Sequence, residues 1–306
     1  MQITSQLLLV RPVRFGFNAA TAVNNAFQQD TGAGAEQKAL AEFDAFAKLL
    51  QQHKLDINIV QDTPEPHTPD SIFPNNWISF HEGGGVFLYP MFAPNRRAER
   101  KETVMKTIAQ KFRVAAIHDL TWFEKEGLFL EGTGSMVLDR ENRIAYACLS
   151  PRTHEKPLLE FCRLAGYKPI VFRAFDSKGF PIYHTNVMMS LADEYVVICL
   201  ESIPDIVERN KVEDQLHSTG KIVLPISLEQ VSHFAGNMLQ VVNTDGERLL
   251  ILSSRARQCL QPAQVHALER YNPLIHSPLD SIETAGGGSA RCMLAELFLP
   301  LKNSRL

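Results

Sequence analysis

A cysteine near the C-terminus follows a run of glycines. Residues 286–293 read GGGSARCM, which places Cys292 shortly after three consecutive glycines. Glycine lets the backbone approach a ligand closely, and a cysteine thiolate is a nucleophile suited to covalent catalysis. The alternative interpretation is an ordinary buried cysteine that opens a last apolar strand over 293–299. Acid–base partners elsewhere in the chain would favour the nucleophile.

Two residues have the chemistry of such partners. His184 lies in the segment IYHTN over 182–186, a polar break just before an apolar strand. Glu131 lies in LEGTGS over 130–135, between an apolar run and a glycine turn. A histidine can act as general acid and general base, and a carboxylate can orient it. Each residue alone could instead be a surface or structural residue, so its position in the fold decides whether a catalytic role is possible.

The elements that must bring these residues together recur in the order hairpin, helix, strand. The hydrophobic pattern predicts helices at 36–53, 97–111, 155–165, 204–217 and 262–271, and strands at 7–11, 56–60, 72–80, 86–89, 113–117, 135–138, 144–148, 169–172, 186–190, 195–200, 222–225, 236–241, 249–253 and near 274. These elements form about five units of about sixty residues, which is typical of a closed repeat architecture rather than a doubly wound sheet. The residues that precede the first strand of each unit would converge at one end of a central axis.

Composition limits the class of function. A chain of 306 residues, 45% hydrophobic and 21% charged, can bury a large core. No linker rich in Pro, Gly or Ser divides it, so we expect a single domain over 1–306. The 31 basic and 34 acidic residues show no long run of either sign, which argues against a nucleic-acid partner and favours a small-molecule substrate.

The sequence shows no sign of export or of membrane insertion. The short apolar stretch at 7–10 is followed rather than preceded by arginines, unlike a signal peptide. No apolar run reaches the length of a membrane span. We therefore expect a soluble, cytoplasmic protein with no membrane partner, and self-association into a homo-oligomer stays open.

The cysteines and histidines follow no metal-binding or disulfide pattern. The five cysteines are widely spaced and never form CxxC, and the ten histidines show no HxxxH or HxH spacing. No glycine loop of the phosphate-binding kind precedes a helix. We therefore expect neither a metal nor a cofactor.

Five segments together resemble the guanidine-modifying enzyme superfamily of amidinotransferases, arginine deiminases and dimethylarginine dimethylaminohydrolases. They are PDSIFPNN (69–76), LEGTGS (130–135), LSPRT (149–153), HTN (184–186) and GGSARCM (287–293), and the order Glu, His, Cys also matches. The resemblance extends from about residue 7 to about residue 299. It implies an α/β fold, a five-bladed α/β propeller (pentein) of ββαβ units with pseudo-fivefold symmetry, which agrees with the repeat count.

The resemblance also implies roles for the three chemical residues. Cys292, as thiolate, would attack the carbon of a guanidino or ureido group. His184 would protonate the departing nitrogen and then activate water, while Glu131 orients and charges His184. The thiolate would need a nearby cation, either the His184 imidazolium or Arg291.

Further residues are candidates to bind an amino-acid substrate. Arg152 in LSPRT, and one of Arg96 and Arg97, could hold the α-carboxylate by bidentate hydrogen bonds. Arg96 and Arg97 could instead simply begin an exposed helix. Asp70 could receive the α-amino group or a distal substrate nitrogen, whereas His233 could be purely structural.

The chain departs from the commoner family pattern at two positions. Deiminases and dimethylaminohydrolases typically carry an aspartate at the position of Asn76, and deiminases carry another at the position of Asn186. An amide can both donate to a C=O and accept from an N–H, whereas a buried carboxylate facing a neutral ureido group would lack a counter-charge. The substitutions favour citrulline over arginine.

This pattern resembles the citrulline-utilisation hydrolases, whose products are ornithine, ammonia and carbon dioxide. The alternatives are an arginine deiminase or dihydrolase and a dimethylarginine dimethylaminohydrolase. A further alternative is a binding protein, because the same propeller also occurs as a ribosome-associated factor without catalysis. Such a protein would not need Cys, His and Glu at the three converging positions.

Overall fold

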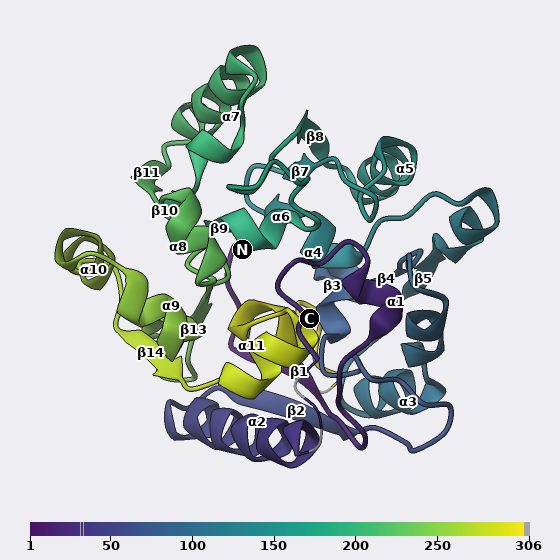
Figure 1. Ribbon diagram of the computed structural model, residues 1–306. Coiled ribbons are helices and arrows are strands. Elements are labelled where there is room, and N and C mark those ends of the chain that lie inside the picture. Colours follow the sequence, from purple (N-terminus) through teal and green to yellow (C-terminus); the bar gives the residue numbers. More distant parts are fainter. Residues whose placement is uncertain (31, 33, 303–306) are drawn as a thin grey trace.

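The computed structural model describes residues 1–30, 32 and 34–302. These residues form five three-stranded sheets, arranged around a common centre (Figure 1). Their strands, sheet by sheet, are β15 (Ala295–Glu296), β1 (Gln6–Arg11) and β2 (Asp56–Gln61); β3 (Ile78–His81), β4 (Gly85–Leu88) and β5 (Ala116–Asp119); β6 (Val137–Asp139), β7 (Ile144–Cys148) and β8 (Lys168–Phe172); β9 (Met189–Leu191), β10 (Tyr195–Ile198) and β11 (Ile222–Pro225); β12 (Leu239–Val242), β13 (Arg248–Ser253) and β14 (Leu274–Ser277).

Helices surround the sheets and also fill the centre. The α-helices are α1 (Ala19–Ala22), α2 (Ala35–Gln52), α3 (Glu102–Lys111), α4 (Gly132–Ser135), α5 (Glu155–Ala165), α6 (Thr185–Met188), α7 (Ile206–Ser218), α8 (Leu228–Ser232), α9 (Ser254–Cys259), α10 (Pro262–Glu269) and α11 (Asp280–Gly286). Short 3₁₀ helices are η1 (Pro74–Asn76), η2 (Glu82–Gly84), η3 (Pro94–Glu99), η4 (Thr121–Glu126), η5 (Leu200–Ser202) and η6 (Ala290–Met293). Figure 1 shows α2, α3, α5, α7 and α10 at the periphery, one beside each sheet.

One pairing scheme repeats in every sheet. The first strand pairs antiparallel with the middle strand, and the middle strand pairs parallel with the third. The parallel pair requires a crossover connection, and the peripheral helix of each unit lies in that connection. The protein is therefore the expected five-bladed α/β propeller of ββαβ units.

The ring is closed by strands from opposite parts of the chain. The blade that contains β1 and β2 receives its first strand, β15, from residues near the C-terminus, with Leu8 opposite Ala295. Contacts between β15 and β3, between β6 and β9, and between β9 and β12 place these first strands around the central axis.

The core lies between each sheet and its peripheral helix. In α2 the apolar side chains recur at helical spacing, and Phe43, Phe46 and Leu50 are completely buried. Full burial of side chains of this size contributes about 1.5–3 kcal/mol each. Among the residues that the model describes, no helix combines the length and the apolar character needed to cross a bilayer.

Several expected elements are partly irregular in the structure. Residues 74–76 of the strand expected over 72–80 form η1, and residues 186–188 of the strand expected over 186–190 lie in α6. The predicted helix over 97–111 is divided into η3 and α3, because Arg96 and Glu99 form a buried ion pair that turns the first part inward. The predicted strand over 293–299 is reduced to β15, because residues 290–293 form the turn η6. These irregular turns adjoin the central axis, where the chemical residues lie.

Candidate active site

Five turns at one end of the propeller present polar side chains to the axis. Each turn immediately precedes the first strand of a blade: η1 before β3, α4 before β6, α6 before β9, the turn over 233–236 before β12, and η6 before β15. Contacts of α4 with η1 and α6, and of η1 with η6, bring these segments together. The side chains that they supply are Asn76, Glu131, His184, Asn237 and Cys292.

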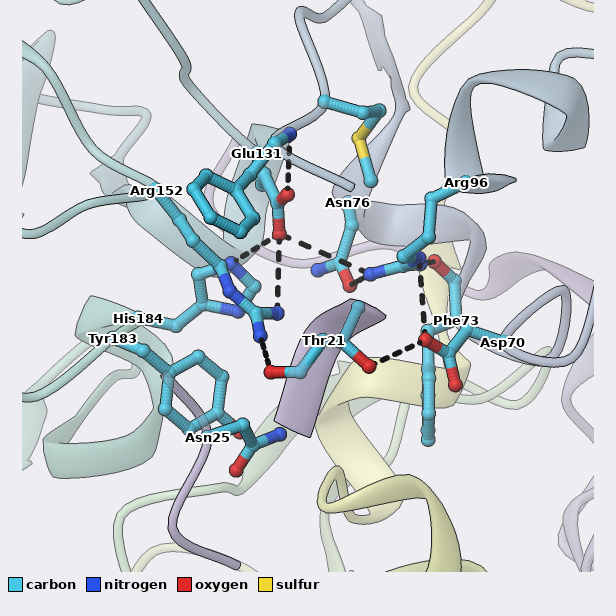
Figure 2. Close-up of polar contacts among 12 residues, drawn as sticks. Thr21, Asn25, Asp70, Phe73, Asn76, Arg96, Glu131, Arg152, Tyr183 and His184 are labelled. Atoms are coloured by element: carbon cyan, nitrogen blue, oxygen red, sulfur yellow. Dashed lines mark hydrogen bonds and ion pairs between the residues drawn. The ribbon is translucent and has the colours of Figure 1, made fainter. Parts of the chain in front are cut away.

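A narrow pocket lies at this end of the axis. Its lining contains six of the residues predicted for the site: Asp70, Asn76, Arg96, Arg152, His184 and Cys292. It also contains Thr21, Asn25, Phe73, Tyr183, Gly286, Gly287 and Gly288. Figure 2 shows the polar groups of this pocket pointing toward one another, with α1 lying across them. Polar groups that converge in a concave site are typical of small-molecule binding.

His184 and Glu131 form a buried pair. His184 Nε2 lies 2.8 Å from Glu131 Oε2, and the other carboxylate oxygen accepts a 3.0 Å hydrogen bond from the Phe92 backbone N–H. Burial lowers the pKa of His184 to about 4 against the opposing effect of Glu131. Burial opposes ionisation of Glu131, but the nearby Arg152 cation and the His184 hydrogen bond lower its pKa to about 2. At neutral pH the pair is a carboxylate that orients a neutral imidazole, which can accept a proton.

Two amide groups approach the Cys292 sulfur. Asn186 Nδ2 lies 3.5 Å from Sγ, and Asn237 Nδ2 lies 3.3 Å from it. The Cys292 backbone N–H donates to Ser289 O at 2.9 Å, which holds the tight turn η6. The side chain of Cys292 is 3% exposed, so its sulfur is shielded from most solvent.

The cations predicted to stabilise the thiolate are engaged elsewhere or uncharged. Arg291 donates to Leu294 O at 2.8 Å and pairs with Glu296 at 2.9 Å. His184 is neutral at pH 7 because of its burial. The direct hydrogen-bond donors to the sulfur of Cys292 are therefore amides rather than charged groups.

Asn76 is held in one orientation. Its Oδ1 accepts a 2.9 Å hydrogen bond from Arg96, whose guanidinium also makes two hydrogen bonds, of 2.8 and 2.9 Å, to Glu99. Its Nδ2 donates to Asn75 Oδ1 at 3.1 Å, so one N–H of the amide has no partner among these contacts. A Cβ at Gly134 would lie 2.5 Å from Asn76 Nδ2 and 2.8 Å from His184 Nδ1, so only glycine leaves room for both.

The segment that contains α1 covers the pocket and binds two predicted substrate-binding residues (Figure 2). Arg152 donates to Asn24 Oδ1 at 2.7 Å and to Thr21 O at 2.6 Å. Asp70 Oδ2 accepts hydrogen bonds from Asn18 at 2.7 Å and from Thr21 at 3.2 Å. Asp70 Oδ1 is buried and has no hydrogen-bond partner among the described residues. Burial raises the pKa of Asp70.

Glu131 and Asn186 are not in the pocket lining but contact His184 and Cys292, which are. Arg97 and His233 lie farther from the pocket. Arg97 donates to Met91 O at 3.1 Å and lies 3.5 Å from Glu124. His233 is exposed and lies within hydrogen-bonding distance of Glu229 O at 2.9 Å. Within the described part of the chain, no group of three or more His, Cys, Asp and Glu side chains is arranged to hold a metal ion.

Sequence reasoning missed four residues of the site: Thr21, Asn25, Tyr183 and Asn237. Asn237 could have been found, because it precedes the first strand of its blade as Glu131 and His184 precede theirs. The first two lie in a segment with no chemical motif. Tyr183 lines the pocket, donates a 2.5 Å hydrogen bond to Gly287 O, and has the Arg152 guanidinium over its ring at 5.0 Å.

Comparisons with known proteins agree with this fold. A family model described as "N,N dimethylarginine dimethylhydrolase, eukaryotic" matches residues 11–299. The unliganded structure of ArgZ, an arginine dihydrolase from the ornithine-ammonia cycle in cyanobacteria, superimposes with a TM-score of 0.75 at 17% identity. The match covers 97% of this chain and 41% of ArgZ. This chain thus spans less than half of that protein.

Two further solved structures cover this chain almost entirely. The product-bound N-terminal domain of ArgZ gives a TM-score of 0.74 at 17% identity and covers 96% of this chain and 99% of the domain. A dimethylarginine dimethylaminohydrolase adduct with S-methyl-L-thiocitrulline gives 0.63 at 13% identity and covers 96% of this chain and 100% of that one. No curated protein matches the chain. The family match over nearly the whole chain shows that it belongs to the dimethylarginine dimethylhydrolase family, within the guanidine-modifying pentein superfamily.

Proposed function

We propose that the protein is a cysteine-dependent hydrolase that converts citrulline into ornithine, ammonia and carbon dioxide. The observation that supports citrulline best is the orientation of Asn76. Arg96 binds its oxygen and Asn75 Oδ1 accepts one of its N–H groups, so Asn76 has one N–H left to offer, near Gly134. An N–H donor suits the C=O of a neutral ureido group, whereas a guanidinium presents only N–H groups of its own.

The reaction would begin with proton transfer from the Cys292 thiol to the neutral His184. The thiolate then attacks the ureido carbon, and the protonated His184 gives its proton to the departing nitrogen, which leaves as ammonia. The enzyme now carries a thiocarbamate between Sγ and the ornithine nitrogen. Water, activated by His184, displaces the sulfur, and the resulting carbamate of ornithine decomposes to ornithine and carbon dioxide. Glu131 keeps the imidazole oriented throughout.

The amino-acid end of the substrate would be held by Arg152 and Asp70. Arg152 now donates to Asn24 and to Thr21 O, and a substrate carboxylate could take over these hydrogen bonds. Asp70 Oδ1 is free to accept from the α-ammonium group. Arg96 is already paired with Glu99, so we assign it to positioning Asn76, and we assign Arg97 no substrate contact. We further propose that residues 1–306 act as one domain without a cofactor.

An arginine dihydrolase is the second candidate. The observation that favours it is Asp70, a buried carboxylate in the pocket with one oxygen unpaired, which could pair with a guanidinium instead of an α-ammonium. The structurally similar ArgZ is described as an arginine dihydrolase. In that case citrulline would be the intermediate of a two-stage reaction in one site.

Product analysis separates these functions. The whole chain would be incubated in parallel with citrulline, arginine and asymmetric dimethylarginine, and ornithine, citrulline, ammonia, dimethylamine and labelled carbon dioxide would be measured. We expect ornithine and carbon dioxide from citrulline, and none from Cys292→Ala. Ornithine from arginine at a higher kcat/KM would favour the dihydrolase. Release of dimethylamine alone, or of citrulline alone from arginine, would overturn the proposal, and no turnover of any substrate would favour a binding protein.

A further inference from the structure

Asn237 lies against the Cys292 sulfur and is completely buried. It precedes β12, the first strand of the blade formed by β12, β13 and β14, and it is 0% exposed. Its turn packs closely against α6. A Cβ added at Gly236 would lie only 2.3 Å from Val187 O. The backbone therefore leaves Asn237 little freedom to move away from the sulfur.

Three hydrogen bonds fix the orientation of the Asn237 amide. Its Oδ1 accepts from the backbone N–H of Arg291 at 3.0 Å, and its Nδ2 donates to the backbone oxygen of Asn186 at 2.9 Å. The reversed orientation would place two oxygens together and two N–H groups together, so the backbone partners exclude it. The N–H that remains points at Cys292 Sγ, 3.3 Å from Nδ2.

Asn186 is a different kind of neighbour. It also donates to Cys292 Sγ, at 3.5 Å, but its Oδ1 is buried and has no hydrogen-bond partner in the described part of the chain. The Asn186 amide is therefore held at its nitrogen alone among these contacts. Asn237 has both ends of its amide occupied and stays in place.

We propose that Asn237 is a further catalytic residue, which donates a hydrogen bond to the thiolate of Cys292 and binds the adjoining backbone so that the sulfur faces the pocket. An N–H donor binds a charged sulfur more strongly than a neutral thiol, so it shifts the acid–base equilibrium toward the thiolate. This role matters because Arg291 pairs with Glu296, and His184 is neutral until it receives the thiol proton. The inference rests on the proposed role of Cys292 but not on the identity of the substrate.

The test measures the alkylation of Cys292 by iodoacetamide as a function of pH, in the whole chain without substrate. Mass spectrometry of the peptide that contains residue 292 separates this thiol from the other four. We expect Asn237→Asp, which keeps an oxygen for the Arg291 N–H but replaces the donor by a negative charge, to move the midpoint of the alkylation profile upward by about one pH unit or more. Asn237→Ala should move it in the same direction by less.

Asn272→Asp is the matched control. Asn272 is buried, and its Oδ1 accepts from Tyr195 and from Gln240, both at 2.9 Å, without touching Cys292. It should leave the alkylation midpoint unchanged. A folded Asn237→Asp protein with the wild-type midpoint would overturn the proposal.

A measurement on the wild-type chain avoids variants that fail to fold. In a ¹⁵N-labelled sample, the side-chain amide resonance of Asn237 should shift with pH at the same midpoint as alkylation, because its hydrogen bond strengthens as the thiolate forms. A resonance that does not titrate contradicts the inference. Since neither experiment uses substrate, a chain that hydrolyses no citrulline could still confirm the role of Asn237. Conversely, if iodoacetamide alkylated Cys292 no faster than the other thiols, the assignment of Cys292 as the nucleophile would be refuted.

Discussion

Among single residues, Asn76 is the one that we propose to contact the ureido group. Its oxygen is bound to Arg96, so Asn76→Asp would keep that hydrogen bond while replacing the amide nitrogen, which now donates to Asn75 Oδ1, by an acceptor. We expect kcat/KM for citrulline to fall by about tenfold or more, because a ureido oxygen would face a carboxylate oxygen. Arginine should gain relative to citrulline, since a guanidinium donates to the new carboxylate. Measuring both substrates on both proteins checks this, and an unchanged ratio would mean that Asn76 does not read the charge of the substrate.

A second prediction at this scale concerns the cysteines. Burial raises the pKa of Cys148 and Cys162 to about 12 and that of Cys199 and Cys259 to about 11, so these thiols stay protonated in the core. We expect Cys292→Ala to abolish turnover and each of the other four Cys→Ala changes to preserve it. Steady-state kinetics with circular dichroism as a control for folding would test this. Substantial activity of the Cys292→Ala protein would eliminate the covalent mechanism.

Some site residues can be predicted from a short sequence motif, whereas others depend on contacts between distant parts of the chain. Glu131, His184 and Cys292 each lie in a short segment whose polar residue interrupts an apolar or glycine-rich run. Arg96 and Arg97 are adjacent, and only the 3₁₀ turn η3 decides that the first faces the pocket. Asn237 carries no distinctive chemistry by itself, because its role depends on a backbone N–H from another blade.

At the scale of elements, the short helix α4 separates two side chains of the site. Gly134 on this helix packs so closely against Asn76 and His184 that Gly134→Ala must displace at least one of them. Displacements of about 1 Å can lower rates by about a hundredfold, and we expect a loss of this order in kcat/KM. Unfolding experiments should show a much smaller effect than the kinetics.

Gly85→Ala is the control for this change. Gly85 lies in β4 with an ordinary φ of −75°, and the nearest atom to an added Cβ is 3.9 Å away. This variant should retain activity. If Gly134→Ala were as active as Gly85→Ala, the close packing of α4 against Asn76 and His184 would not be needed for catalysis.

The elements were predicted best where their hydrophobic pattern is regular. The peripheral helix α5 occurs at the expected residues, because its apolar side chains recur at helical spacing. The turns before the first strands were not resolved by pattern: residues 185–188 form α6 where a strand was expected. Contacts between blades determine the conformation of these turns, and such contacts cannot be predicted from the hydrophobic pattern of one segment.

At the scale of the whole molecule, the stability of the fold depends on pH through the site. His184 has a pKa of about 4 in the folded protein and an ordinary value of 6.5. Between these values the unfolded chain binds a proton that the folded chain does not bind. The stabilisation is therefore complete above pH 6.5 and is lost as the pH falls toward 4, by on the order of 3 kcal/mol.

Urea unfolding between pH 4 and pH 7 measures this contribution. The wild-type free energy of unfolding should fall more steeply on acidification than that of His184→Gln, which has no imidazole to protonate. Glu131 contributes at lower pH, because its pKa changes from 4.5 to about 2. If the free energy of unfolding changed equally with pH in the two proteins between pH 4 and 6.5, the loss of stability would not come from protonation of His184.

Closure of the ring by β15 also orders events during synthesis. A ribosome releases the segments with Glu131 and His184 well before the one that carries Cys292, which directly precedes the closing strand. A nascent chain therefore lacks the proposed nucleophile while the blade that contains β1 and β2 is still incomplete. Cys292 acquires its amide neighbours only when η6 docks beside the other turns, so the reactive thiol itself reports that the ring has formed.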